Sequence, residues 1–416
     1  MTDLLVAVIF HQIGPYHHAR LNAASCSLRV IGIEWSGREA YPWGQSASRP
    51  GYGKVTLFPN GEVEHRTKAE LGEAIGNVLD EVKPNVVAVN GWNDFGSLIT
   101  IRCCGRREIP MVVMSESSQI DEPRKWWTEL FKRRLVDVFR AGLVGGQSHR
   151  DYLEELGMPA QRVFTGYDAV DNTYFAQGAK EVRSKESSVF AQGFDATGKS
   201  GIRRRYGLPE NYFLASARFI EKKNLATLLR AYAAYRERSS LVTGHSSLWH
   251  LVLLGDGPLK ADLCRLISDL GLQNSVLLPG FKQYGELPAY YGLAGAFIHA
   301  STSEQWGLVV NEAMASGLPV LVSKRCGCAA DLIQEGRNGF TFDPEKIEEM
   351  AELMMRMTAA PSRLREMGDA SQEIISQWGP DHFARGLDAA ARTAMEVGPK
   401  RMRLTDTLML EGLIRR

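Results

Sequence analysis

The sequence has no excess of charge of one sign and no long apolar run. Its 49 lysines and arginines face 48 aspartates and glutamates, which leaves a formal net charge of +1 at pH 7. Such a balance gives no overall field for binding nucleic acid or acidic partners. No apolar stretch approaches the roughly 20 residues that cross a bilayer. We therefore expect a soluble protein, or one that at most rests on a membrane surface, without a nucleic acid partner.

Cysteine is also scarce, and its spacing excludes the common zinc sites. The six cysteines include two close pairs, Cys103–Cys104 and Cys326–Cys328, but no second pair or nearby histidine completes a zinc motif. So few cysteines in 416 residues indicate free thiols in a reducing compartment. The short apolar run at 4–10 follows an acidic residue and predicts a first β-strand, not a signal peptide. These features predict a cytoplasmic protein.

The sequence does contain a repeated alternation of short apolar runs with helical patterns. Short runs bounded by turn residues are typical of buried strands in parallel sheets. Five runs fall in the first half (4–10, 27–35, 86–90, 111–115 and 141–146) and five in the second (212–218, 249–257, 275–281, 295–301 and 318–324). Amphipathic segments such as 68–84 lie between them. The pattern predicts an α/β protein with two parallel sheets.

A polar segment rich in glycine and serine separates the two halves. Its composition predicts a linker or exposed loop at 179–207. Residues 1–178 would then form one α/β domain and residues 208–380 the other. Ligands of open α/β sheets bind at the carboxyl ends of the strands, so we expect the functional residues there.

Two glutamates lie on either side of the start of a predicted helix that follows the run at 295–301. Gly307 stands at the helix start, where unpaired backbone N–H groups favour an anion such as phosphate. Glu312 lies about one turn further in, and its carboxylate could accept hydrogen bonds from ribose hydroxyls. Glu304, in the loop, could contact a polar group beyond the phosphates. The alternative is an acid that complements the helix dipole and a solvent-exposed Glu304.

Two cations follow the neighbouring run at 212–218. Arg218 and Lys223 lie across a turn that leads into another helix, and Lys222 is an alternative to Lys223. Positive charge at this place suits a diphosphate leaving group, on which negative charge grows as its bond breaks. The alternative is an ordinary solvated basic turn.

These residues resemble the second domain of the retaining glycosyltransferases of family 4. The resemblance rests on E-x7-E from Glu304 to Glu312, followed by NEAMASGLPVLVS, and on R-x4-K from Arg218 to Lys223. Three further segments occur in the order and spacing of that family: LLGDGP (253–258), LPGF (278–281) and GRNGFTFDP (336–344). The resemblance covers about the whole second half. In the first half it is looser, and VDNTYF (170–175) is similar to the segment where the family's first domain ends.

The resemblance implies a GT-B fold, in which two Rossmann-like domains face each other across a cleft and C-terminal helices, here 381–416, cross back to the first domain. It implies transfer of a sugar from a UDP- or GDP-linked donor to an acceptor hydroxyl, with retention of configuration, in polysaccharide or glycoconjugate biosynthesis. The acceptor would be a glycan, a lipid-linked group or a small molecule. Such enzymes usually need no metal and no cofactor, and this sequence has no D-x-D motif that would hold a metal.

The family's motifs imply a role for each matching residue. Arg218 and Lys223 would hold the diphosphate, and Glu312 would bind the ribose. The transferred sugar would contact Glu304 and the backbone of three residues: Trp306, Gly307 and Leu308. The base would be bordered by three others: Gly280, Phe281 and Lys282.

The first half departs from the family at two places. Family members often have a Gly-Gly pair after the first strand, near the donor, whereas HQIGPYHHARL has only Gly14. Many have a histidine after the strand at 111–115, and Glu116 stands at about that place. Glu116 could orient the acceptor hydroxyl or act as a base, or it could be structural. His17 and His18 are further candidates, against the alternative that each is a structural group with satisfied hydrogen bonds.

The segment 122–140 is basic and aromatic with helical periodicity. It could lie on an anionic membrane surface, on the inner face of the membrane, and meet a lipid-linked acceptor. The alternative is an amphipathic helix that packs on its sheet through Trp, Leu and Phe. The C-terminal segment 400–416 presents the same two alternatives.

Other activities remain as alternatives. GFDATGKS (193–200) matches the phosphate loop G-x-x-x-x-G-K-S, but a polar segment precedes it where that loop needs a buried strand, so we expect a chance match. As an NTPase, the chain would need Mg²⁺, ATP or GTP, and Lys199. A nucleotide-sugar epimerase of the same fold would need acid and base groups around the sugar and no acceptor. A non-catalytic sugar-nucleotide binder is a third alternative.

Overall fold

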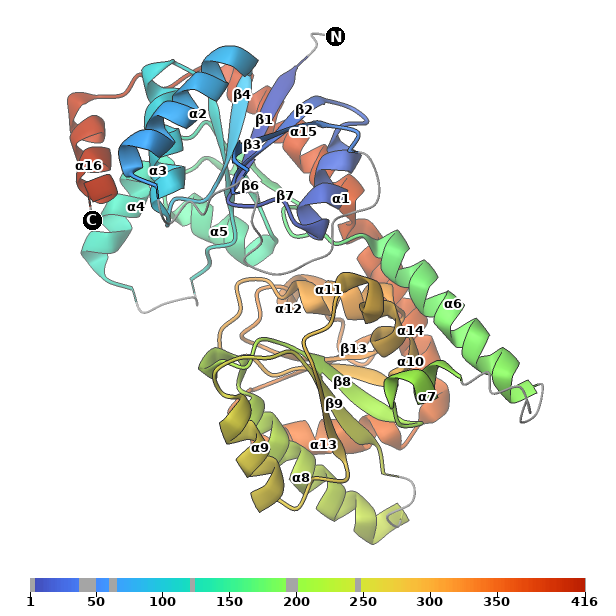
Figure 1. Ribbon diagram of the computed structural model, residues 1–416. Coiled ribbons are helices and arrows are strands. Elements are labelled where there is room, and N and C mark those ends of the chain that lie inside the picture. Colours follow the sequence, from blue (N-terminus) through green and yellow to red (C-terminus); the bar gives the residue numbers. More distant parts are fainter. Residues whose placement is uncertain are drawn as a thin grey trace. The chain divides into compact units, whose positions relative to one another are not determined.

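The computed structural model describes residues 4–36, 50–59, 66–119, 124–191, 201–243 and 248–415. The chain divides into two compact units (Figure 1): unit 1 comprises Met1–Val170 and Trp378–Arg416, and unit 2 comprises Asp171–Gln377. Each unit contains one sheet in which all neighbouring strands are parallel. The predicted α/β fold class with two parallel sheets is confirmed.

Unit 1 has the strand order β3-β2-β1-β4-β5-β6-β7. Its elements are β1 (Leu5–Phe10), α1 (Pro15–Ala24), β2 (Arg29–Ser36), β3 (Gly53–Phe58), α2 (Lys68–Val82), β4 (Val86–Asn90), α3 (Phe95–Arg106), β5 (Met111–Ser115), α4 (Trp126–Val136), β6 (Ala141–Val144), α5 (Gln147–Glu155), β7 (Val163–Thr165), α15 (Pro380–Val397) and α16 (Leu404–Arg415). Successive side chains of a strand point to opposite faces of its sheet. Ala7 and Ile9 of β1 therefore join the core beneath α2 and α3, whereas Val6 and Val8 join the core beneath α1 and α15.

The two C-terminal helices complete unit 1. Helix α15 packs on α1 and on strands β4 to β7, and its Phe383 and Leu387 are fully buried. Helix α16 lies outside α3, where Leu410 and Ile414 enter the core cluster of that face (Figure 1). The segment 378–416 thus belongs with the first half of the chain in space.

Unit 2 has the strand order β10-β9-β8-β11-β12-β13. Its elements are α6 (Asn172–Ala191), α7 (Ile202–Tyr206), β8 (Tyr212–Ser216), α8 (Leu225–Thr243), β9 (His250–Leu254), α9 (Lys260–Asp269), β10 (Val276–Gly280), α10 (Leu287–Leu293), β11 (Ala296–His299), α11 (Leu308–Ala315), β12 (Val320–Ser323), α12 (Ala329–Leu332), β13 (Gly339–Phe342), α13 (Ile347–Thr358) and α14 (Pro361–Ile375). Helices α8, α9 and α13 share one core cluster with β8 and β9, and α10 and α11 pack against α6.

All ten strands predicted from the sequence are present, and the pattern missed three: β3, β7 and β13. Each missed strand lies at the edge of its sheet. An edge strand is short or only half-buried, so it needs no continuous apolar run. Strand β3 shows this directly, because its last four residues are all half-buried.

The expectation of an exposed loop at 179–207 is wrong for most of that segment. Residues up to 191 continue α6, and Ile202–Tyr206 form α7. Phe175 and Ala179 are fully buried on the face of α6 that packs on α10 and α11. The polar composition belongs to the outward face of this helix. The division between the two units falls at 170/171, and not at 178 as predicted. The phosphate-loop match at 193–200 lies outside the described residues.

Two glycines test the packing of the C-terminal helices. A Cβ on Gly386 of α15 would lie 2.4 Å from the carbonyl oxygen of Thr165 and 2.7 Å from Cδ1 of Leu143, whereas one on Gly412 of α16 meets nothing within 4 Å. We expect Gly386→Ala to lower the free energy of unfolding by about 1–3 kcal/mol through overpacking. The control Gly412→Ala should raise it by about 0.5–1 kcal/mol, because alanine favours the helix. Urea unfolding of the full chain measures both, and equal effects would contradict the packing described.

Candidate functional site

The carboxylate of Glu304 lies at the centre of a polar cluster at the carboxyl end of the unit 2 sheet. Its Oε2 lies 3.1 Å from Nε2 of His299, accepts a hydrogen bond from Oγ of Ser301 at 3.2 Å, and forms an ion pair with the ammonium of Lys223. His299 ends β11, and Lys223 lies in the turn after β8. Because β8 and β11 are adjacent and parallel, their carboxyl ends bring these groups together. The Glu304 side chain is only 14% exposed, so the expectation of a solvent-exposed glutamate is wrong.

The charge state of this cluster follows from its contacts. Burial by itself would raise the pKa of Glu304, but the hydrogen bond from His299 and the charge of Lys223 outweigh it and hold that pKa well below its usual range. Burial lowers the pKa of His299, which the contact with Glu304 only partly opposes. A neutral His299 with its proton on Nε2 donates to the carboxylate. Glu304 is therefore a fixed anion, and it is unsuited to give up a proton as a general acid.

Backbone hydrogen bonds hold the Glu304 loop from two sides. The N–H of Thr302 donates to the carbonyl of Lys222 at 2.8 Å, which ties the loop to the turn after β8. The N–H of Glu304 donates to the carbonyl of Arg325 at 3.3 Å, and its carbonyl accepts from the N–H of Gly327 at 2.9 Å. Lys222 thus contributes its carbonyl to the site. The side chain in the cluster is that of Lys223.

Helix α11 begins directly after this loop. Gly307 is its N-cap residue and has φ +105°, a left-handed conformation that favours glycine. Within the described residues no side chain caps this end, which leaves its N–H groups in the arrangement that suits an anion. Trp306 is fully buried, and its indole N–H donates to Oδ1 of Asn311 at 2.9 Å. Trp306 and Leu308 can therefore present backbone to a ligand, as the resemblance implies.

Glu312 lies inside α11 and is 1% exposed. Its Oε2 accepts a hydrogen bond from the hydroxyl of Tyr291 at 2.6 Å, and burial raises the pKa of Tyr291 well above its usual value, so that hydroxyl keeps its proton. Glu312 is thus a buried, hydrogen-bonded group and more than a complement to the helix dipole. Of the two matched cations, Arg218 is exposed, whereas the Lys223 side chain is 12% exposed. The alternative of a solvated basic turn is therefore wrong for Lys223.

The predicted base-bordering residues follow β10. Gly280 has φ +84°, and Phe281 is one of the exposed large apolar residues. The ammonium of Lys282 lies 5.6 Å from the centre of the Tyr290 ring and 3.9 Å from a carboxylate oxygen of Glu286. These contacts hold Lys282 against α10.

In unit 1, Glu116 follows β5, and its charge acts on Asp168. Asp168 is fully buried, with a guanidinium nitrogen of Arg20 at 3.9 Å from its Oδ1. Burial and the charge of Glu116 raise the pKa of Asp168 well above its usual value, against the effect of Arg20. The raised pKa favours a protonated Asp168 beside Glu116. Sequence reasoning missed Asp168, which lies three residues after β7, a strand that the apolar pattern also missed.

The other unit 1 candidates have local partners. The N–H of Gly14, the N-cap residue of α1, donates to Nδ1 of His17 at 3.2 Å. Burial lowers the pKa of His17, so it stays neutral and can accept that bond. Nδ1 of His18 lies 3.1 Å from the hydroxyl of Tyr52. Both histidines thus fit the structural alternative.

Sequence reasoning also missed His299. It is a polar residue at the carboxyl end of an apolar strand, five positions before Glu304, and that position was the available signal. Among the described residues, no three or more His, Cys, Asp or Glu side chains are grouped to hold a metal ion.

Helix α4 does not pack on its sheet through the residues we expected. Eight large apolar side chains in the described ranges are exposed, and six of them lie on α4 and α16: Trp126, Trp127, Leu130, Phe131, Leu404 and Leu408. We call these six the α4–α16 surface. Arg134 joins the two helices through hydrogen bonds to Asp406 at 2.7 Å and Thr405 at 2.6 Å. The alternative of a helix packed through Trp, Leu and Phe is wrong for Trp126, Trp127, Leu130 and Phe131. It is confirmed for the end of the segment, where Leu135 and Phe139 are buried in the core. No described helix has the length and apolar character needed to cross a membrane.

Comparisons with known proteins show what unit 2 is similar to. The model described as Glycosyl transferases group 1 matches residues 200–374. The sulfoquinovosyl transferase SQD2 of Arabidopsis thaliana is 36% identical over 131 residues, 31% of this chain and 25% of that protein. A GDP-mannose-dependent alpha-(1-6)-phosphatidylinositol monomannoside mannosyltransferase of Mycolicibacterium smegmatis is 27% identical over 197 residues, 45% of this chain and 48% of that protein. The chain spans between 17% and 64% of the length of such curated relatives.

Solved structures show the fold. The sucrose-phosphate synthase of Thermosynechococcus elongatus aligns with a TM-score of 0.71 and 16% identity, covering 95% of this chain and 100% of that one. Anabaena Alr3699/HepE in complex with UDP-glucose aligns with a TM-score of 0.65 and 16% identity, covering 95% and 99%. With two parallel-sheet, Rossmann-like units, the chain has the GT-B fold.

The Glu304 cluster makes a pH-dependent prediction. Glu304→Gln should destabilise unit 2 at pH 7 by about 1–3 kcal/mol, because Lys223 and His299 lose their charged partner. A carboxyl group with a lowered folded-state pKa contributes stability that is present above its unfolded pKa of about 4.3 and lost as the pH falls. The difference from wild type should therefore stay constant from pH 7 to about pH 5 and shrink as the pH falls below about 4.3.

Urea unfolding across this pH range measures the difference. Glu221→Gln, an exposed glutamate in the neighbouring turn, is the matched control and should change little. A difference for Glu304→Gln that is the same at every pH would contradict the ionised state assigned to Glu304.

Proposed function

Residues 200–374 belong to the group 1 glycosyl transferases, and on that premise we propose that the chain transfers a sugar from a nucleoside-diphosphate sugar to an acceptor hydroxyl, with retention of configuration. The observation that carries the proposal is the Glu304 cluster. A partly buried anion, a partly buried cation and a helix end without a side-chain cap occur within one strand-end region of unit 2. As the bond between the sugar and the diphosphate breaks, positive charge grows on the sugar and negative charge on the diphosphate. The arrangement provides a charge of opposite sign for each.

Each charge has a role in this reaction. Negative charge grows on the diphosphate as it leaves, and Arg218, Lys223 and the N–H groups of α11 would stabilise it. Positive charge grows on the sugar ring, and the fixed carboxylate of Glu304 would lie on that side. The hydrogen bond from His299 would keep Glu304 oriented. The ammonium of Lys223 would contact both Glu304 and the diphosphate. Glu312 would bind the ribose through its carboxylate.

We propose the donor and the acceptor site by chemical class only. HepE was solved with UDP-glucose and the mycobacterial relative is named for GDP-mannose, so we propose a UDP- or GDP-linked donor that binds without a metal. Glu116, beside the buried Asp168 whose pKa it helps to raise, is the group in unit 1 that would orient the acceptor hydroxyl. Nothing in the residues or the comparisons favours an epimerase over a transferase.

We further propose that the α4–α16 surface contacts an anionic bilayer. Trp126 is 73% exposed, and tryptophan at the surface of a basic helix is typical of membrane interfaces. Residues 125–136 carry four basic side chains against the single acid Glu129. The charge of this segment complements an anionic lipid surface, and its apolar side chains suit the headgroup region. The contact would bring a lipid-linked acceptor to the enzyme.

Thermal unfolding in the presence of nucleotides tests the donor site. A nucleoside diphosphate at ~100 times its dissociation constant should add ~2.7 kcal/mol without metal. We expect one of UDP and GDP to do so, and Arg218→Ala and Lys223→Ala to abolish the shift. Lys222→Ala should keep it, because only the Lys222 carbonyl joins the site.

The same experiment separates the alternatives. Stabilisation only by ATP with Mg²⁺, lost in Lys199→Ala, would contradict the transferase and favour the phosphate loop. Stabilisation that Lys223→Ala leaves intact would contradict the placement of the diphosphate at the Glu304 cluster.

Binding to vesicles tests the membrane contact. Trp126→Ser with Phe131→Ser should lower the affinity for vesicles that contain phosphatidylglycerol by more than tenfold, because two interfacial aromatic side chains are lost. Met395→Ser, an exposed apolar side chain on α15, is the matched control. Equal losses in both, or no binding by the wild type, would contradict the contact.

A further inference from the structure

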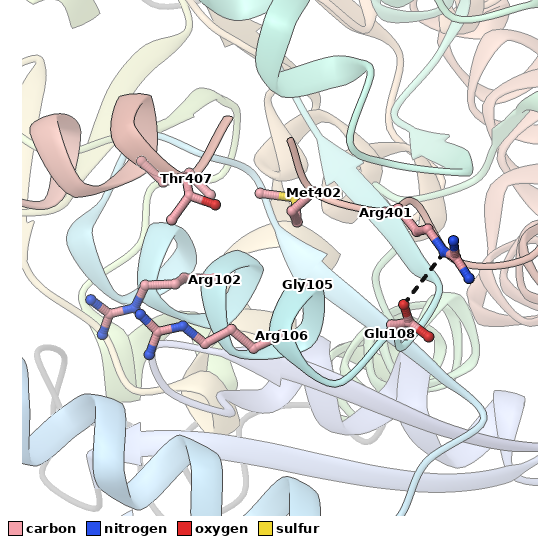
Figure 2. A pocket seen from close by; sticks show the side chains of 8 residues that line it. Arg102, Gly105, Arg106, Glu108, Arg401, Met402 and Thr407 are labelled. Atoms are coloured by element: carbon pink, nitrogen blue, oxygen red, sulfur yellow. Dashed lines mark ion pairs between the residues drawn. The ribbon is translucent and has the colours of Figure 1, made fainter. Parts of the chain in front are cut away.

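Helices α3 and α16 enclose a cavity of about 540 Å³ on unit 1, beyond the residues assigned above. Figure 2 shows Arg102 and Arg106 side by side on α3, with Thr407 of α16 across from them. Met402 lies on Gly105, where a Cβ would come within 2.6 Å of its Cγ, and forms the apolar part of the lining together with Leu410. The volume is that of a small-molecule site.

The charges in this cavity do not cancel. Arg102 and Arg106 share one carboxylate oxygen of Glu411, at 3.0 Å and 3.6 Å. Arg401 has a carboxylate oxygen of Glu108 at 3.7 Å, the ion pair drawn in Figure 2, and its side chain is 91% exposed. Three guanidinium groups therefore face two carboxylates, and one positive charge is left over.

A buried donor in the cavity wall also has no acceptor. Nε of Arg102 is buried and has no hydrogen-bond partner among the described residues. That nitrogen is closed to solvent, so a ligand in the cavity would meet the terminal guanidinium nitrogens of Arg102 instead. Arginine binds phosphate through paired N–H groups, which the parallel Arg102 and Arg106 can supply. The missing component is thus an anion with several acceptor oxygens.

The cavity borders the α4–α16 surface along α16. Thr407 and Glu411 form one stripe of the helix, and Leu404 and Leu408 lie three or four residues away on the adjoining stripe. Leu404 and Leu408 are exposed. A bilayer that touches these leucines would bring its headgroups to the mouth of the cavity.

We propose that this cavity binds the phosphate group of an anionic phospholipid headgroup. The inference builds on the proposed membrane contact but adds a specific site to it. The chain would recognise such a lipid by a cavity lined with arginines, and not by diffuse attraction alone.

The test compares two pairs of arginines on the full chain. Arg106→Gln with Arg401→Gln removes two charges from the cavity while leaving the partly buried Arg102. Arg133→Gln with Arg403→Gln removes two exposed charges near the same surface but outside the cavity. Binding is measured on phosphatidylcholine vesicles with and without phosphatidylglycerol. We expect the cavity pair to lower affinity for the anionic vesicles about tenfold more than the control pair, and to leave binding to neutral vesicles unchanged.

Soluble glycerol 3-phosphate forms the second arm. It should raise the melting temperature of the wild type and of the control pair, but not of the cavity pair. Equal losses of vesicle binding in both pairs would overturn the lipid assignment in favour of diffuse attraction. Stabilisation by glycerol 3-phosphate without a selective loss on vesicles would overturn it in favour of a soluble phosphate ester.

The outcome is distinguishable from failure of the membrane contact. Trp126→Ser with Phe131→Ser should lower binding to both kinds of vesicle and leave the glycerol 3-phosphate shift intact. If the wild type binds no vesicles, the membrane contact fails, and the headgroup assignment fails with it. Absence of a glycerol 3-phosphate shift in the wild type would overturn the cavity as a phosphate site.

Discussion

The ionised carboxylate of Glu304 holds together the segments that make up the strand-end region of unit 2. It contacts the turn after β8 through Lys223, the end of β11 through His299, and its own loop through Ser301. Each contact needs the negative charge, because Lys223 is a cation removed from most solvent and His299 is neutral and must donate. A lowered pKa of Glu304 and a fixed loop are therefore two consequences of one set of contacts.

The contacts of Glu304 also explain why we place the proposed donor site on a fixed stretch of backbone. The Glu304 loop leads straight into Gly307, whose left-handed conformation starts α11 and aims its N–H groups. Trp306 is fully buried and anchors the backbone between these two features. A ligand would meet backbone and fixed charges here, with few side chains free to move. Preorganised charge of this kind is what stabilises a developing leaving group without reorganisation at the moment of reaction.

Unit 1 combines a buried interior with an unusual exterior. Its sheet brings Glu116 to a carboxyl strand end near Asp168, and burial together with the charge of Glu116 raises the pKa of Asp168. On its outside, α4 and α16 expose aromatic and aliphatic side chains, which a helix usually packs against its sheet. The same α16 closes an arginine-lined cavity against α3. The proposed acceptor group and the proposed lipid surface thus lie in different parts of one unit.

The sequence by itself determined the α/β class, ten of the strands and the two motifs that carry the family resemblance, since these depend on short-range periodicity and on local spacing. Edge strands such as β3 escaped it, because half-burial leaves no continuous apolar run. Helix α6 was mistaken for a loop, since only its inner face is apolar. Tertiary structure alone decided that Lys223 and not Lys222 reaches Glu304, that His299 completes that cluster, that Asp168 lies near Glu116, and that the aromatic face of α4 is exposed. Each of these depends on which distant segments meet, and periodicity along one chain contains no record of that.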